Sequence, residues 1–354
     1  MKNLKTQGFV LLDVDVVALN NAGKNTSSNF DNAVATKKIY KNGRSYVYAS
    51  GQAWRYWWRE ALQRNFGWEL SPVIREAKIA FTSADPIKYA DDDVFGYMKA
   101  ASEKITDEKG KEKSVNITVT RVSPLKNSAI ISVASVNPIE NWSSMARQEG
   151  DSVPYSKQEY SAIMKGMFSL DLVMVGTFSN YNKTGFVNLS EKLRKEAIEK
   201  GATEFDDPFV KATDGKPAKL IRLDKETRKR RVLETIQALK NITGGAMQTN
   251  NMGDVTPKFI VLATTTTGNH PFSHIVKSTG KNDEIAELNV VGLKEVLIDY
   301  KNTIEGKVFI GKRSGFLDDE NKALEDLKSL GFVEFTSINE AIDKYCEQLQ
   351  KQIE

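Results

Sequence analysis

Apolar runs separated by polar segments indicate that the chain mixes strands and helices. Residues 8–19 read GFVLLDVDVVAL, where Asp13 and Asp15 alternate with apolar positions, and this pattern predicts a strand with one polar face. A polar loop is expected over residues 20–38, followed by a short strand at 44–49. A strand, a long loop, a strand and then a helix are typical of an α+β layer architecture.

The helix expected after residue 49 combines aromatic, small polar and basic residues. Residues 46–62 read YVYASGQAWRYWWREAL, with tryptophans at three-to-four-residue spacing, which predicts an anchored apolar face. Ser50 and Gln52 stand at the expected helix start, where they can cap the helix or bond a phosphate. Arg55 and Arg59 are four positions apart and share one face. The pattern indicates a surface that reads the backbone of a polyanion; the alternative is a buried helix whose arginines merely reach solvent.

The middle of the chain has a weaker pattern. Residues 102–114 are highly charged and predict an exposed or disordered loop. Two strands are expected within 115–136, around a turn at 123–128, and irregular structure is expected over 137–165. The next strand is predicted at residues 168–178, where apolar and polar positions alternate again.

The segment that follows predicts an insertion and then a return to the core. We expect a helix at 190–200 and a basic β-ribbon that turns at Asp214 and Gly215. An amphipathic helix is predicted at 225–240, with glycines 244 and 245 suited to its end and to a close backbone approach. The remaining expected elements are a strand at 258–264, a strand at 307–312 and a helix at 339–350.

Composition limits the classes of protein that fit. The 354 residues include 50 Lys and Arg against 46 Asp and Glu, so positive charge must act locally rather than as an overall excess. A single cysteine, Cys346, excludes an internal disulfide and a cysteine-based zinc site, and fits a reducing compartment. No apolar run has the length of a membrane span, so we expect a cytoplasmic protein without a membrane partner.

Four places combine Lys or Arg with small polar, glycine or aromatic residues, as single-stranded nucleic-acid sites do. They are Lys24 with Asn25, the segment from Ser50 to Arg59, the segment from Arg121 through Lys126 to Asn127, and the segment from Thr243 through Gly244 and Gly245 to Met247. Each has a plainer alternative. Arg121 and Lys126 also suit a solvated strand edge, and the glycines suit a helix stop. Met164 and Met167 fit either base stacking or core filling.

Catalytic interpretations find less support in the sequence. The Asp91–Asp93 triplet is a possible metal site, but consecutive carboxylates point in different directions, and acidic charge at a helix start is the simpler interpretation. His270 and His274 are four apart, yet Pro271 lies between them and opposes a helix. We therefore expect no catalytic residue, no metal and no cofactor.

Taken together, these residues resemble the DevR family of the RAMP superfamily, the repeated backbone subunit of type I-B CRISPR Cascade complexes. The similarity covers about the first three quarters of the chain. The segments that carry it, in order, are Val16 to Asn21, Ser50-Gly-Gln52 with Arg55 and Arg59, Arg121 to Ser128, Phe168 to Leu172 with Val175-Gly176, and Gly244 to Met247.

The resemblance implies a modified RNA-recognition-motif (ferredoxin-like) core with large insertions. The core, or palm, would comprise residues 1–85, 166–180 and 225–287. A fingers insertion would occupy 86–165 and a β-hairpin thumb 181–224. Residues 288–354 would form a C-terminal α/β cap.

The resemblance also implies a set of partners. Copies would associate head to tail along a CRISPR guide RNA, next to a guide-end capping subunit and a large subunit, and would meet target DNA through the guide. Guide phosphates would contact Lys24, Asn25, Ser50, Gln52, Arg55 and Arg59. Arg121, Lys126, Thr243 and Met247 would also contact RNA, Met164 and Met167 would flank a displaced base, Gly244 and Gly245 would approach the backbone, and Phe209 is a candidate at the thumb tip.

Two other functions fit parts of the same pattern. Subunits of type III complexes cut target RNA with an aspartate in the loop after the first strand, and Asp31 lies in about that position. A free-standing single-strand RNA-binding protein is the other alternative.

Overall fold

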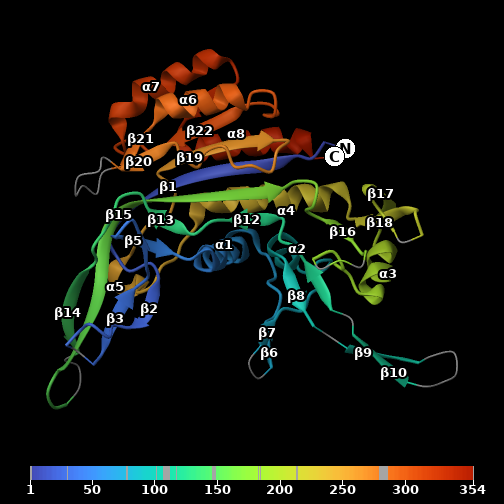
Figure 1. The fold of residues 1–354 in the computed structure, drawn as a ribbon, viewed down its shortest axis with the longest axis horizontal. Helices are drawn as coiled ribbons and strands as arrows, with labels where there is room; N and C mark the ends of the chain where they lie inside the picture. The colour runs from blue at the N-terminus through green and yellow to red at the C-terminus, as the bar shows by residue number, and fades with distance from the viewer. Residues whose placement is uncertain are drawn as a thin grey trace.

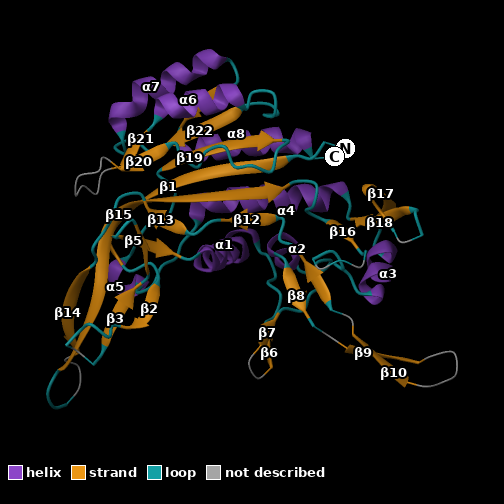
Figure 2. Cartoon of the chain, viewed as in Figure 1, coloured by secondary structure: helices purple, strands orange, loops and turns teal. Residues whose placement is uncertain are grey.

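The computed structural model describes residues 2–29, 31–76, 79–100, 102–106, 112–116, 118–145, 149–181, 183, 185–212, 214–278 and 286–353. Within them, a twelve-stranded mixed sheet organises the chain (Figures 1 and 2). Its main path runs β23 (Val333–Thr336), β22 (Val308–Lys312), β19 (Phe259–Thr265), β1 (Lys5–Val17), β15 (Val153–Asp171), β13 (Ile130–Ser132), β5 (Arg44–Ala49) and β4 (Lys38–Lys41). The strands beside this path are β2 (Asn21–Lys24), β3 (Ala33–Thr36), β12 (Leu125–Asn127) and β14 (Ile139–Met145).

Alternation along β1 supplies a core on each face of the sheet. Val10 and Leu12 belong to one buried cluster, whereas Phe9 and Leu11 belong to another. The first cluster is covered by α1 (Gly51–Phe66), α4 (Lys225–Gln237) and α8 (Ile338–Gln352). The second is covered by a C-terminal layer that includes α6 (Val290–Asp299) and α7 (Asn321–Asp326), at the top of Figure 1. The α+β class expected from the sequence is confirmed.

Hairpins and small sheets extend from the side of the sheet that carries α1 (Figure 1). These smaller elements are β6 (Ile74–Glu76), β7 (Ile79–Phe81), α2 (Ala90–Phe95), β8 (Tyr97–Lys99), β9 (Ser102–Thr106), β10 (Glu112–Asn116), β11 (Val119–Arg121), β16 (Thr177–Ser179), α3 (Glu191–Glu199), β17 (Thr203–Lys211) and β18 (Pro217–Arg222). The remaining elements are the 3-10 helices η1 (Ala238–Asn241), η2 (Asp318–Glu320) and η3 (Leu327–Leu330), with α5 (Gln248–Asn251), β20 (Val276–Ser278) and β21 (Ala286–Leu288).

Aromatic packing fixes α1 against the sheet. The rings of Trp54 and Trp58 stack with centroids 5.5 Å apart, and Phe168 of β15 meets Trp58 edge-on at 5.1 Å. A Cβ atom on Gly166 would lie 3.0 Å from the Trp54 ring, so glycine permits this close approach. The Trp58 indole N–H donates to the carbonyl of Thr235 at 2.7 Å, which ties α1 to α4. The tryptophan face is therefore a rigid anchor, as its spacing predicted.

Most elements expected from strong periodicity are confirmed. Strands form at β1, β5, β19 and β22, and helices at α1, α3, α4 and α8. The ribbon of β17 and β18 turns at the expected place, with Gly215 at φ 80°. The last segment joins the main sheet, because β22 pairs with β19, and α8 packs on the same face as α4.

Several expectations about the middle of the chain are wrong. Residues 137–165 are not irregular, since β14 pairs with the outer half of β15 from Ile139↔Glu159 to Met145↔Val153. The strand expected at 168–178 ends at Asp171, and turns precede β16. The loop over 20–38 contains β2 and β3, the turn expected at 123–128 contains β12, and the charged tract forms β9 and β10, with residues 107–111 outside the described residues.

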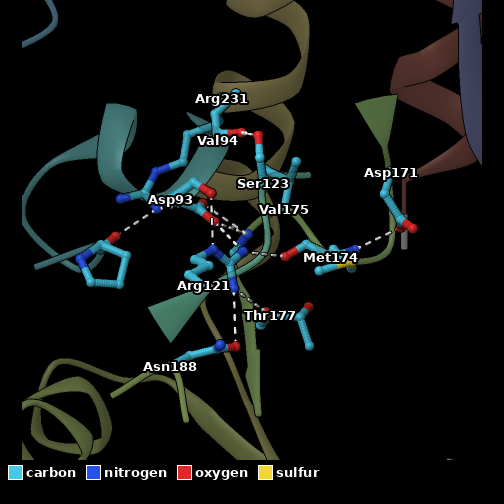
Figure 3. A network of polar contacts seen from close by, with 12 residues as sticks. Asp93, Val94, Arg121, Ser123, Asp171, Met174, Val175, Thr177, Asn188 and Arg231 are labelled. Carbon is cyan, nitrogen blue, oxygen red and sulfur yellow. Dashed lines mark hydrogen bonds and ion pairs between the residues drawn. The ribbon is translucent and has the colours of Figure 1, made fainter. Parts of the chain in front are cut away.

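A buried ion-pair network joins α2 to α4 and to the loop after β15 (Figure 3). The Asp93 carboxylate bonds Arg121 Nη2 at 2.5 Å and Arg231 Nη1 at 2.6 Å, and the Gly176 amide donates to it at 2.9 Å. None of the three charged side chains is more than 3% exposed. Arg121 also donates to the carbonyls of Met174 and Thr177. Its assignment as an RNA contact is therefore wrong: this arginine crosslinks the core.

Candidate nucleic-acid interface

A groove of about 480 Å³ lies beside the N-terminal half of α1. Its walls come from α1, from the corner between α2 and β8, and from the segment that leads into β12. The lining residues are Gly51, Gln52, Arg55, Arg59, Phe95, Gly96, Val122, Ser123, Leu125, Lys126 and Asn127. The tertiary structure thus brings Gln52, Arg55 and Arg59 together with Lys126. The sequence had placed the three helix residues in one candidate site and Lys126 in another.

Local capping fixes the helix start at the edge of this groove. The Ser50 hydroxyl accepts the Ala53 amide at 3.2 Å, and the Ser50 amide donates to Asn20 Oδ1 at 3.0 Å. The side chain of Asn127 donates to the Gly51 carbonyl at 3.1 Å, which holds β12 against the first turn. The capping role predicted for Ser50 is confirmed, whereas a phosphate contact by Ser50 or by the exposed Gln52 stays a prediction.

Arg55 forms part of the groove wall. Its guanidinium donates to the carbonyls of Leu125 and Phe95 at 2.7 and 2.5 Å, and to Asn127 Oδ1 and Ser123 Oγ at 3.1 and 3.0 Å. All four acceptors are neutral. Burial, together with the nearby charge of Arg59, lowers the pKa of Arg55 to about 10, so the group still carries its charge at neutral pH. Arg55 therefore gives the groove a fixed positive charge that no carboxylate among its described partners neutralises.

Arg59 is half-buried in the groove wall, with a side chain that is 27% exposed. Its guanidinium lies 4.2 Å from the centre of the Phe95 ring, and its Nε is 3.8 Å from Asp91 Oδ2. Asp91 is nearly fully buried, and Ser71 donates its amide to that carboxylate at 3.0 Å. Burial, with a smaller contribution from Asp92, raises the pKa of Asp91 to about 6, although the Ser71 amide and Arg59 oppose the shift.

Lys126 contributes an exposed positive charge on a flexible side chain to the groove. It is exposed on β12, where it pairs in register with Ser169 of β15. No ion pair of Lys126 occurs within the described residues. A flexible ammonium opposite fixed guanidinium groups can follow the phosphates of a bound strand.

The glycine loop lies on another side of α1. A Cβ atom on Gly244 would lie 2.1 Å from the Trp57 ring, so the close approach is to tryptophan. Gly245 has φ 112° and Met247 has φ 57°, while Thr243 is exposed. Trp57 is two positions from Arg55, or about 200° around the helix axis. The segment 243–247 does not line the groove, and RNA contact there stays a prediction.

Lys24 is the last residue of β2 and Asn25 begins the loop to β3, next to the hairpin of β14 and β15 (Figure 1). Lys24 is exposed and pairs with Asp31 at 3.4 Å, and the Asp31 side chain is fully exposed. Asn25 is only 8% exposed and donates to Glu140 at 3.4 Å, so it fastens the loop to β14. These residues are not part of the groove lining.

Met164 and Met167 occupy opposite faces of β15. Met164 is fully buried in the cluster beneath α1, whereas Met167 packs against the C-terminal cluster. Positions three apart on a strand point to opposite faces. The expectation that both flank one displaced base is wrong, because both side chains fill cores.

The chain sequence matches the family described as the CRISPR-associated negative auto-regulator DevR/Csa2 over residues 10–287. The chain belongs to the DevR/Csa2 family. Two solved structures share the fold. A chain titled CRISPR RNA-guided surveillance complex superposes with a TM-score of 0.50 at 10% identity, covering 98% of this chain and 99% of its own length. A second, titled CRISPR RNA-guided surveillance complex, pre-nicking, gives 0.51 at 10% identity, covering 97% and 99%. A comparison with curated protein sequences finds no significant match.

In this DevR/Csa2 chain, the wall residue Phe95 and the Arg59 partner Asp91 were absent from the sequence-based RNA site, whereas Ser123 and Asn127 lay within the candidate segment 121–127 without a role of their own. Asn127 and Ser123 were visible only as part of a polar segment, and Phe95 only as the end of the acidic helix. Their roles depend on α2 meeting α1. The described residues contain no group of three metal-ligating side chains and no helix long and apolar enough to cross a membrane.

The electrostatics of Asp91 predict that RNA binding by this family member depends on pH. Below about pH 6 the Asp91 carboxyl takes up a proton, so Arg59 loses its paired carboxylate and the groove gains positive charge. We expect affinity for a single-stranded oligoribonucleotide, measured by fluorescence anisotropy, to rise several-fold from about pH 7.5 to about pH 5.5. Asp91→Asn should remove this dependence and bind tightly at both pH values; an unchanged pH profile in the variant would assign the effect to other groups.

Protonation of Asp91 also makes the stability of the folded chain depend on pH. The pKa of Asp91 is about 6 in the folded chain against 3.8 for the ordinary carboxyl, so the folded state holds the proton more tightly. Stability from this group therefore rises as the pH falls through about 6 and is fully present below 3.8. The shift corresponds to about 3 kcal/mol.

Proposed function

We propose that this chain is a non-catalytic backbone subunit that holds guide RNA in a CRISPR surveillance complex. The observation that carries the proposal is the groove beside α1, where Arg55 presents a charge without a carboxylate partner and Lys126 faces it from β12. Fixed and movable cations at a helix start suit a sugar-phosphate backbone and provide no pattern for reading bases. Sequence recognition is left to base pairing between guide and target DNA.

The strand order supports a palm built like an RNA-recognition motif. The chain order β1, α1, β13, β15, α4, β19 gives the spatial order β19-β1-β15-β13, with each neighbouring pair antiparallel. Both helices of this unit pack on one face. A β-α-β-β-α-β unit with this order is the ferredoxin-like arrangement. The remaining strands then extend or insert into that unit.

The projecting elements support the fingers and thumb assignments. The ribbon of β17 and β18 presents Phe209, which is 82% exposed, and a projecting aromatic side chain suits insertion between bases. On β14, Ile139, Trp142 and Met145 are all more than half exposed. Such an apolar arm suits a head-to-tail contact with the next copy, and repeated copies sum modest charge along one RNA. The other partners of the proposed assembly are a guide-end capping subunit and a large subunit.

Native mass spectrometry tests the backbone role. Co-expression with a CRISPR repeat-spacer RNA is expected to give complexes in which one RNA carries several copies of the chain, and a longer spacer adds copies. Each copy neutralises a few phosphates, so occupancy follows RNA length. A constant ratio of one chain per RNA for both lengths contradicts the proposal and indicates a free-standing RNA-binding protein.

A cleavage assay tests the non-catalytic part of the proposal. The guide-loaded protein is incubated with complementary RNA and magnesium, next to the Asp31→Ala variant. The expected result is intact RNA with both proteins. Cleavage at regular spacing that is lost in Asp31→Ala contradicts the proposal and assigns a nuclease role to the exposed carboxylate beside Lys24.

A further inference from the structure

The hairpin of β4 and β5 carries a second group of cations outside the groove. Residues 32–59 contain six Lys and Arg residues and no Asp or Glu. Two of the six, Arg55 and Arg59, line the groove, while Lys37, Lys38, Lys41 and Arg44 belong to the hairpin or lie next to it. The turn at Asn42 and Gly43 has φ 50° and 72°, which is typical of a tight two-residue hairpin. The structure therefore places these charges on two paired strands whose register is known.

Strand register places part of this group on one sheet face with aromatic residues. Lys41 pairs with Arg44 and Ile39 with Tyr46, while the Tyr48 amide donates to the Lys37 carbonyl. Directly paired residues point to the same side of a sheet, and so do residues two apart on a strand. Seven residues make up this surface, which we call the hairpin face: Lys37, Ile39, Lys41, Arg44, Tyr46, Tyr48 and Lys165.

Lys165 joins the hairpin face through the neighbouring strands. Ile131 of β13 pairs with Tyr48 on one side and with Lys165 on the other, so the three are in register. Burial and the nearby charge of Lys41 lower the pKa of Lys165, which agrees with this proximity. Lys165 donates to the Ser273 carbonyl at 3.3 Å. The hairpin face thus extends from the edge of the sheet towards the C-terminal layer.

The hairpin face is separate from the groove. Val47 and Ala49, which alternate with Tyr46 and Tyr48, are fully buried in the cluster beneath α1. The hairpin face therefore points away from α1 and its groove. Lys41 and Arg44 are exposed, and Tyr46 and Tyr48 are half-buried. Among the described residues, none of its four cations forms an ion pair with a carboxylate.

We propose that the hairpin face binds a second single strand of nucleic acid while the groove holds the guide. Its lysines and Arg44 would contact phosphates, and Tyr46 and Tyr48 would support stacked bases. The Lys41 ammonium already lies 4.0 Å from the centre of the Tyr46 ring, so cation and aromatic surface are arranged together. Interleaved cations and rings on a sheet surface favour single-stranded nucleic acid over an acidic protein, because stacking uses flat rings and tolerates any base. The strand is either DNA or RNA, since both present phosphates and bases.

Anisotropy titrations with labelled oligodeoxythymidine and oligouridine test the proposal. The hairpin variant Lys41→Glu with Arg44→Glu is compared with Lys294→Glu with Lys322→Glu, two exposed lysines of the C-terminal layer that give the same change in net charge. Both pairs are also placed in a groove-defective background, Gln52→Glu with Lys126→Glu. The hairpin pair is expected to weaken binding at least tenfold in both backgrounds and to flatten its salt dependence, while the control pair changes it little. The probe that loses more affinity identifies DNA or RNA as the strand.

Three results would overturn this assignment. Equal losses of oligonucleotide affinity in the hairpin pair and the control pair would show that only the overall charge of the protein matters. Loss of co-purifying guide RNA in the hairpin variant, with circular dichroism unchanged, would make the hairpin part of the groove. Unchanged binding of both probes, with loss of an acidic protein partner instead, would assign the face to that protein. Because guide retention is measured separately, failure of this assignment is distinguishable from failure of the proposed backbone function.

Discussion

Asp93→Ala is expected to destabilise the chain by about 3–5 kcal/mol, a larger loss than most single substitutions cause. Asp93 is fully buried and pairs with both Arg121 and Arg231. Without the carboxylate, two guanidinium groups stay buried without a counter-charge, and the Gly176 amide loses its acceptor. The midpoint of urea denaturation, followed by circular dichroism, measures the loss.

Asp92→Ala provides the matched control for that experiment. Asp92 is its neighbour on α2 and is equally buried, and its carboxylate accepts the Asp85 amide at 3.0 Å. Within the described residues it forms no ion pair with an arginine. We expect a loss of about 1–3 kcal/mol, as for one buried acceptor. Equal losses in the two variants would show that the arginine network adds no stability.

Charge reversal in the groove is expected to abolish guide retention with little effect on folding. Gln52 and Lys126 are exposed and lie on opposite walls, so Gln52→Glu with Lys126→Glu places two carboxylates where phosphates would bind. We expect guide RNA to be lost on purification and oligoribonucleotide affinity to fall by on the order of a hundredfold at moderate salt. Absorbance ratios of the purified protein and anisotropy titrations measure the two effects.

The control for the groove variant repeats the same chemical changes elsewhere. Gln63 is exposed near the end of α1 and Lys322 is exposed on α7, and neither lines the groove. Gln63→Glu with Lys322→Glu should retain guide RNA as the unmodified chain does. Guide retention by the groove variant at the level of this control would rule out the groove as the RNA site.

The contacts of Arg55 explain why Gln52 and Lys126, rather than the two arginines, are the residues to replace in a test of RNA binding. The sequence places Arg55 and Arg59 on one helix face, which suggests replacing both with alanine to remove RNA binding from an intact fold. The structure shows four hydrogen bonds from Arg55 to residues of β12, its approach segment and α2. Its loss would open the groove wall, so an effect on RNA would not separate charge from shape.

Much of the fold could be predicted from local sequence patterns. The tryptophan spacing predicted the anchored face of α1, Ser50 was expected as a cap, and the apolar runs predicted β1, β5 and β19. These features depend on contacts within one or two turns or on simple alternation. The outer half of β15 was missed because its half-exposed, polar residues become a strand only through pairing with β14.

Sequence alone determined which residues carry charge and which helix face displays Arg55 and Arg59, because periodicity fixes direction around a helix axis. Only the tertiary structure decided which cations face a ligand. Arg231 and Asp93 are 138 positions apart, and their contact buries a charge that local pattern would leave in solvent. Lys126 has no such partner among the described residues and stays exposed beside α1. Exposure of a long charged side chain depends on distant partners, which local spacing does not encode.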